Sequence, residues 1–211
     1  MSISYPLTLP SVGIRTVRFR PVTVVGVSRS PFTFQHQNQV HAGQAWVADV
    51  VLRAMARAEA EAWIATLLAL NGKQGTFLLG DPAGKNPRGS GSGSPVVSGA
   101  GQAGQTLSTS GWTASAQGVL LKGDWIQLGG TGSPVTPKRI HRVLNDVNAD
   151  GGGLATIDIW PRLRESPLNG SAVVLTNTVG TFMLDSNEMP YEVEPGPMYS
   201  IDFGAIEDLR T

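Results

Sequence analysis

The sequence predicts a mainly β protein, with an N-terminal β-sandwich that carries one packed α-helix and a small β-barrel domain inserted into it. Composition is the first indication, because 26 Gly, 14 Pro and only 15% charged residues favour short strands and turns. The second is that one segment alone, 57–72, has apolar residues at helical spacing. The third is that two similar segments, GTFLLGD at 75–81 and GTFMLD at 180–185, lie on either side of a stretch whose composition and pattern differ from the rest of the chain.

The helix is predicted over residues 57–72, RAEAEAWIATLLALNG. Its apolar stripe consists of Ala60, Trp63, Ile64, Leu67 and Leu68. Glu59 lies in the first turn, where the helix dipole favours a carboxylate, and Asn71-Gly72 is typical of a helix end. Because such a stripe needs an apolar surface, we expect the helix to pack on a sheet.

Alternation of apolar and polar residues predicts the strands around this helix. The clearest run is 45–53, and the C-terminal run 198–209 should close the same sheet. Residues 1–13, broken by prolines, are expected to form an N-terminal arm or an edge strand, and residues 31–44 a loop. Either of these two segments is a candidate for an arm laid on a neighbouring subunit.

The chain changes character at Asp81. The segment DPAGKNPRGSGSGSP, residues 81–95, has no apolar periodicity and predicts a long flexible loop or linker. Short strands then resume before the second GTF segment. We therefore expect the chain to leave the first sheet near Asp81 and to re-enter it near Thr181. This interpretation divides the chain into a first sandwich part at 1–81, an inserted barrel at 82–178 and the closing strands of the sandwich at 179–211.

Charge and cysteine content exclude some classes of function. A formal net charge of zero gives no support for nucleic-acid binding or membrane-surface binding. With no Cys, the chain has neither disulfides nor thiolate metal sites. No segment has the length and apolarity of a membrane span, and residues 1–19 lack the apolar run of a signal peptide. We expect a soluble protein made in the cytosol, or released from it by lysis.

A glycine motif resembles a dinucleotide-binding fingerprint. Gly99, Gly101 and Gly104 match G-x-G-x-x-G, which functions at a strand-to-helix turn where the helix N-terminus meets the pyrophosphate. The segment that follows, QTLSTSGW, does not predict a helix. A flexible loop is therefore the preferred interpretation over a nucleotide site.

An acidic motif resembles the start of a calcium loop. It consists of Asp146, Asn148, Asp150 and Gly151. The twelfth position of such a loop should be a bidentate Glu, but here it is Ile157, and the flanking segments predict strands. A hairpin turn is preferred over a calcium site.

No catalytic group of residues is predicted. The three histidines, His36, His41 and His141, are not at metal-ligand spacing, and no Ser lies in a nucleophile elbow. The carboxylates considered for acid–base chemistry are interpreted as solvated faces or turn caps: Asp124, Asp158, Glu165 and Glu188. The expectation is a protein that is not an enzyme and has no cofactor and no metal.

Three tryptophans support the one hypothesis of ligand binding. Trp112, Trp125 and Trp160 have indole rings that can stack on sugars. Trp125 and Trp160 alternate with polar neighbours on predicted strands, so the core of the barrel is the preferred interpretation. A basic cluster is interpreted as a solvated or ion-paired face; it consists of Arg139, Arg142, Arg162 and Arg164.

Two stretches resemble a known family. The first, residues 45–82, has an extended segment, then a helix with a Trp, then Asn-Gly and G-x-F-x-x-x-D-P. The second combines GVLLKGDWIQLGG at 118–130 with residues 142–170 and GTFMLDS at 180–186. Together they resemble the distal tail proteins of long-tailed bacteriophages with non-contractile tails, which join the tail tube to the tail tip.

The resemblance implies a function and a set of partners. In that family an N-terminal β-sandwich with one helix forms a ring around the tube axis, commonly a hexamer, and a second β domain projects outward. It implies a virion structural protein at the tail tip, made in the host cytoplasm, whose partners are its own copies, the tail tube protein and the tail-tip hub protein. The alternative is a carbohydrate-binding module, in which the inserted barrel recognises a host surface polysaccharide through its tryptophans. A cell-wall hydrolase, a third reading, lacks any motif. The cysteine-bound iron–sulfur clusters of some relatives cannot be carried over, because this chain has no Cys.

Overall fold

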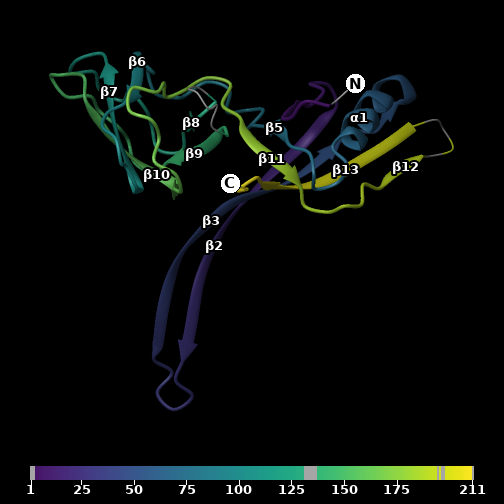
Figure 1. The fold of residues 1–211 in the computed structure, drawn as a ribbon, viewed down its shortest axis with the longest axis horizontal. Helices are drawn as coiled ribbons and strands as arrows, with labels where there is room; N and C mark the ends of the chain where they lie inside the picture. Colours follow the sequence, from purple (N-terminus) through teal and green to yellow (C-terminus); the bar gives the residue numbers. More distant parts are fainter. Residues whose placement is uncertain (1–2, 131–136, 194, 196–197, 211) are drawn as a thin grey trace.

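A computed structural model describes residues 3–130, 137–193, 195 and 198–210. Within these residues the chain forms thirteen strands and one α-helix, which confirms the prediction of a mainly β fold with one packed helix. Figure 1 shows two β regions side by side, with the helix on the first region and a long hairpin that projects away from it. In the described part of the chain, no helix combines the length and apolarity needed to cross a bilayer.

The first sheet is built from both ends of the chain. Its strands, in spatial order, are β1 (Leu7–Thr8), β5 (Phe77–Leu79), β11 (Gly180–Leu184), β13 (Met198–Glu207), β3 (His36–Leu52) and β2 (Ile14–Arg29). Two short strands, β4 (Met55–Ala56) and β12 (Tyr191–Val193), pair with the first part of β13. The two GTF segments are neighbours, since Phe77 on β5 lies opposite Phe182 on β11. The chain therefore leaves this sheet after β5 and returns to it at β11, while the division into domains at 81/82 and 178/179 stays a prediction.

The helix α1 (Arg57–Ala69) covers the first sheet. It ends before the predicted limit, and Asn71 and Gly72 form the turn that follows, both with positive φ. Trp63 is fully buried, packs near Phe203, and donates an Nε1 hydrogen bond of 2.7 Å to the carbonyl of Val12. The predicted stripe is wrong at Leu68, which is exposed because it points away from the sheet.

Residues 3–13 contain β1 at the edge of the first sheet, which confirms the edge-strand alternative, and they also pack on their own chain. The Tyr5 hydroxyl donates a 2.7 Å hydrogen bond to the carbonyl of Ala69, and the amide of Leu7 donates one of 2.8 Å to Thr76. Gly13 has a φ of 102°, and a Cβ there would lie 2.8 Å from the Met55 side chain. The segment is therefore part of the fold of this subunit.

The second sheet closes into a small barrel. Its strands, in spatial order, are β6 (Gly93–Val97), β7 (Gly104–Trp112), β10 (Ala155–Leu163), β9 (Arg139–Val143) and β8 (Trp125–Leu128). Ala172 bridges to Val96 on β6, and Val174 bridges to Gln127 on β8. Because one segment bridges both edge strands, neither edge is left open. Within the barrel, segments 119–121 and 172–175 form only isolated bridges.

The connection from the first sheet to the barrel is not the flexible linker that its composition predicts. Asp124 is buried and its carboxylate accepts hydrogen bonds from the amides of Leu121, Arg88 and Gly89 at 2.9, 3.0 and 3.1 Å. Burial alone raises the pKa of Asp124, but these three amides and the charge of Arg88 outweigh it, and the pKa falls below its ordinary value. Of the two interpretations of Asp124, the solvated face is wrong, while the turn cap agrees with its bond to Leu121; the residue also holds the connection against the barrel.

Strands β2 and β3 continue beyond the first sheet as a two-stranded hairpin. β13 pairs with β3 only at residues 47–51, and no other described strand pairs with residues 22–43. The register shifts between Thr23 and Val25, close to where the hairpin leaves the body. The prediction of a loop at residues 31–44 is wrong, because β3 begins at His36 and only residues 30–35 form the turn.

Candidate functional site

The glycine motif lies in a strand-to-strand connection. Gly99 and Gly101 fall between β6 and β7, and Gly104 begins β7, so no helix N-terminus is present there to receive a pyrophosphate. All three glycines have positive φ, and a Cβ on any of them would meet nothing within 4 Å. The motif therefore forms an open hairpin turn.

The oxygens of the acidic motif are directed at separate backbone amides. Asp146 accepts from Lys122 at 2.8 Å, and Asn148 accepts from Gly118 at 2.7 Å. Asp150 accepts from Gly152 at 2.8 Å within its own turn. Across the residues that the structure describes, no group of three or more His, Asp or Glu side chains is placed to hold a metal ion.

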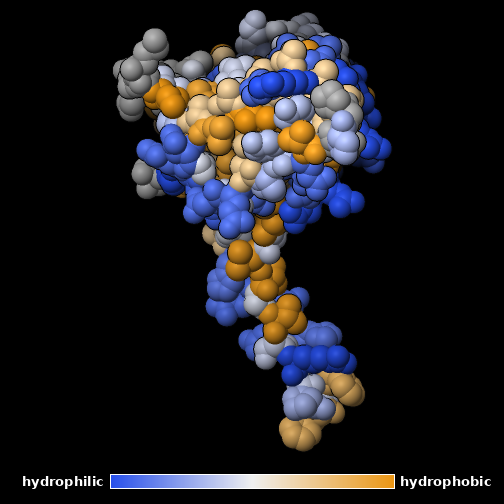
Figure 2. Space-filling view, turned by 90° about the vertical axis from the view of Figure 1, so that its right-hand side faces the viewer, coloured by the Kyte–Doolittle hydropathy of each residue, from blue (hydrophilic) through white to orange (hydrophobic). Residues whose placement is uncertain are grey.

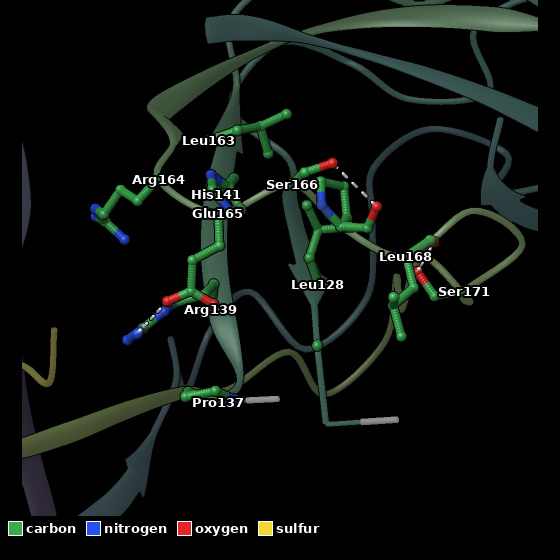
Figure 3. A pocket seen from close by; sticks show the side chains of 12 residues that line it. Leu128, Pro137, Arg139, His141, Leu163, Arg164, Glu165, Ser166, Leu168 and Ser171 are labelled. Atoms are coloured by element: carbon green, nitrogen blue, oxygen red, sulfur yellow. Dashed lines mark hydrogen bonds and ion pairs between the residues drawn. The ribbon is translucent and has the colours of Figure 1, made fainter. Parts of the chain in front are cut away.

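One small pocket brings several of the predicted site residues together (Figure 3). Arg139, His141, Arg164 and Glu165 line it, and its volume is about 50 Å³. A single water needs roughly 10–15 Å³ of such volume, so the pocket has room for a few waters and not for a substrate. Arg139 lies 3.7 Å from Glu165, which forms an ion pair across the pocket wall.

His141 in this pocket is a buried neutral residue. Its Nδ1 lies 2.7 Å from the carbonyl oxygen of Pro161. Burial, together with the nearby charges of Arg164 and Arg139, lowers the pKa of His141 to about 4, although the bond to Pro161 opposes the shift. A neutral imidazole held by a backbone carbonyl fits a structural role.

The arginines of the predicted basic cluster serve the contact between the barrel and the first sheet. The guanidinium of Arg142 lies 4.4 Å from the ring centre of Trp125 and 3.8 Å from Asp81. Arg164 forms an ion pair with Glu207 on β13. The backbone amide of Arg162 donates to the side chain of Gln44 on β3. The ion-paired interpretation therefore describes Arg139, Arg142 and Arg164.

Two of the three tryptophans are not where the preferred interpretation put them. Trp112 lies in the barrel core, but Trp125 and Trp160 pack against the core of the first sheet. Their rings lie 5.0 and 4.4 Å from the ring of Trp46, and Phe19 completes this aromatic junction. Alternation along the strands indicates a buried face, but not which of two bodies covers it. Trp112 and Trp125 are buried and leave no open ring face on which a sugar can stack.

The sequence analysis named residues 31–44 as a candidate arm, but it missed that they belong to a long projecting hairpin. Apart from Ser30, every residue from Pro21 to Gly43 is exposed. Val25 and Val40 lie opposite each other in register, and Val27 and Val40 are 65% and 75% exposed. Figure 2 shows hydrophobic side chains along the hairpin down to its tip.

The hairpin is also almost without charge. Arg29 is the one charged residue between positions 21 and 45, which otherwise hold apolar residues, uncharged polar residues and two histidines. Edge strands that face water are usually protected by charged side chains. The sequence feature that indicates this exposed hairpin is therefore the lack of charge over a long segment, and not a periodic pattern of apolar residues.

A buried ion pair fixes the base of the hairpin. Arg164 donates to both carboxylate oxygens of Glu207, at 2.7 and 2.6 Å, and its Nε donates to the carbonyl of Gln44 at 3.0 Å. Glu207 also accepts the amide of Trp46 at 3.1 Å. We call these four residues the clamp. It joins the barrel, strand β13 and the point on β3 at which the hairpin departs, so it fixes the base of the hairpin to the body.

Comparison of the chain with models of known protein families gives no match, and comparison with curated proteins gives none either. The function is therefore argued from the surface of the molecule. The most prominent feature of that surface is a long, exposed, almost uncharged hairpin. It is suited to association with another protein chain.

Proposed function

We propose that the protein is a structural subunit of a closed homo-oligomeric ring at the end of a phage tail tube, and that the β2–β3 hairpin is the arm that joins neighbouring copies. The observation that carries this proposal is the exposure, from Pro21 to Gly43, of an almost uncharged hairpin with a row of exposed valines and two phenylalanines. An isolated two-stranded hairpin is marginally stable in water, so an arm of this length needs a partner.

The edges of the hairpin support association through strands. β2 is the last strand of the first sheet, so its outer edge carries unpaired amides and carbonyls. Beyond Trp46 the outer edge of β3 is also unpaired among the described strands. These edges have three protective features: Pro21, the charge of Arg29, and the register shift that follows Thr23. That is slight protection for two long strands.

The clamp supports a ring over an irregular aggregate. A head-to-tail contact closes into a ring only when each subunit is rotated by a fixed angle relative to the last. The Arg164–Glu207 pair and the aromatic junction hold the hairpin and barrel in one orientation, so each copy presents its arm at the same angle. The place on a tail tube, the partners there and the number six rest on the resemblance to distal tail proteins.

The experiment compares the full chain with a variant whose arm is shortened. Residues 24–43 are replaced by Asn-Gly, because Thr23 and Gln44 lie opposite each other and a two-residue turn can join them. Light scattering and negative-stain microscopy should show rings for the natural chain, and a folded monomer for the shortened one. Val40→Lys is the matched point variant and should also prevent assembly. Equal assembly of all three proteins would refute the role of the arm.

A further inference from the structure

We infer that the arm of one copy inserts Phe32 into an apolar groove on the next copy, beside strand β1. This inference rests on the proposed function, since it assumes that copies associate through the hairpin. It goes beyond that function by naming both halves of the contact. The two halves are different surfaces of one chain, as a head-to-tail ring requires.

The hairpin tip presents one side chain as an anchor. Phe32 is 91% exposed, and the turn that carries it is ordered by Ser30, whose hydroxyl accepts the amides of Phe32 and Thr33 at 3.3 and 3.2 Å. Phe34 already has a partner in its own chain, because the guanidinium of Arg29 lies 4.4 Å from its ring centre. A rigid, exposed aromatic ring loses little conformational entropy on binding, which is typical of the anchor residues of interfaces.

The groove has the size and chemistry to receive a phenyl ring. Its volume is about 270 Å³, and its wall combines apolar side chains, among them Leu9, Ile14, Leu78, Leu79 and Val179, with polar ones such as Ser11 and Thr178. A dry apolar cavity of roughly 150 Å³ is known to hold benzene. The only charged residues of the lining are Asp81 and Lys85, and Asp81 already accepts a hydrogen bond from Trp125 at 2.9 Å.

Two other hollows among the described residues suit a phenyl ring less well. The pocket beside His141 has a volume of about 50 Å³ and is too small. A hollow of about 400 Å³ on the barrel is lined mostly by polar side chains, among them Ser98, Ser108 and Asn148. The groove beside β1 is the one of the three that combines room with an apolar wall.

The occupant of the groove cannot be the tip of the same chain. Ile14 lines the groove and is also the first residue of β2, while Phe32 lies beyond the other end of that strand. At 3.3 Å per residue the 16 residues of β2 span about 50 Å. Every copy of the chain has both the arm and the groove. A second copy is therefore the partner whose groove can receive Phe32.

Cross-linking of engineered cysteines tests this contact without background, because the chain has no Cys. Thr33→Cys keeps Phe32 at the tip, and Ser11→Cys lies in the exposed part of the groove. A mixture of the two variants with a short bismaleimide should give a cross-linked heterodimer at the oligomer-forming concentration. The matched control is Thr33→Cys mixed with Ala114→Cys, which lies on the barrel surface. This mixture should give at least about tenfold less cross-linked product, because a specific contact should have at least about tenfold higher affinity than a random encounter.

A second measurement uses the dissociation constant of the oligomer. Phe32→Ala should raise it by about 30-fold or more, the effect of losing an interface anchor. Phe34→Ala should have a smaller effect. If the natural chain assembles through its hairpin but Phe32→Ala assembles equally well and no Thr33–Ser11 cross-link forms, the groove contact is wrong and the proposed arm stands. If the natural chain stays monomeric at all concentrations, both are wrong. Phe32-dependent flotation with phosphatidylcholine–phosphatidylglycerol vesicles, without the cross-link, overturns the groove contact in favour of a lipid surface.

Discussion

Replacing Glu207 with Ala should loosen the clamp and lower the stability of the whole subunit. The Glu207 side chain is 0% exposed, and that of its partner Arg164 is 17% exposed. The variant leaves the guanidinium without its carboxylate and the Trp46 amide without its acceptor. Two polar groups would thus lose their partners in the interior, where water cannot replace them.

The magnitude follows from this burial. Removing one partner of a buried ion pair costs about 3–5 kcal/mol, because the other charge stays buried and uncompensated. For a chain of this length each kcal/mol shifts Tm by about 2–4 °C, so Tm should fall by about 6–20 °C. Glu61→Ala is the matched control, because it breaks an Arg57–Glu61 pair whose side chains are 75% and 52% exposed. An exposed pair of this kind contributes little to stability, so Glu61→Ala should leave the Tm almost unchanged.

The assay is urea unfolding followed by tryptophan fluorescence. Adding Arg164→Met to Glu207→Ala should recover part of the loss, because the double variant no longer buries an unpaired charge. Recovery would also separate the ion pair from a simple loss of packing. A loss below about 1 kcal/mol for Glu207→Ala would refute the view that the clamp holds the barrel and hairpin to the sheet.

Three further predictions concern the helix, a buried histidine and the connection to the barrel. Trp63→Ala removes a buried ring and the donor to the Val12 carbonyl, and should cost about 3–5 kcal/mol in urea melts; a loss under about 1 kcal/mol would mean that the helix does not pack on that face. The pKa of His141 is about 4 in the folded chain and 6.5 ordinarily, so the unfolded chain binds more protons between these two pH values. The stabilisation should therefore be fully present above pH 6.5, and the free energy of unfolding should fall by about 3 kcal/mol towards pH 4. His141→Gln should remove this dependence on pH, and its persistence in the variant would contradict the assignment. Asp124→Asn weakens the bonds to the 88–89 amides and should make trypsin cut after Arg88, whereas the natural chain should resist there; equal cleavage of both would count against a fixed connection.

The helix could be predicted from sequence because its burial is one-sided. Residues such as Trp63 and Leu67 face a sheet, while the opposite side of the helix faces water. Apolar residues therefore recur in the sequence at helical spacing. The hairpin could not be predicted in this way, because both faces of residues 22–43 are exposed in the single chain. Alternation reports burial on one face of a strand, so a strand with two open faces carries none.

The connection to the barrel was misread because glycine has more than one use. A Cβ on Gly89 would lie 2.6 Å from the Cα of Leu120, so the residue permits a close approach of two backbone segments. Gly93 has a φ of 108°, and a Cβ there would meet the carbonyl of Gly111 at 2.5 Å. Composition alone does not distinguish glycines that allow close packing from those of a flexible linker. The buried acceptor Asp124, which fixes the segment, lies far away in the sequence.

The most direct test of the account is a cryo-electron microscopy map of the assembled protein, alone or on isolated tails. We expect a closed ring in which every β2–β3 hairpin lies against the next copy, with the ring seated at the end of the tail tube. A map in which the hairpins extend freely into solvent while other surfaces hold the copies together would contradict the role of the arm. A map that places the protein away from the tube end would contradict the proposed function itself.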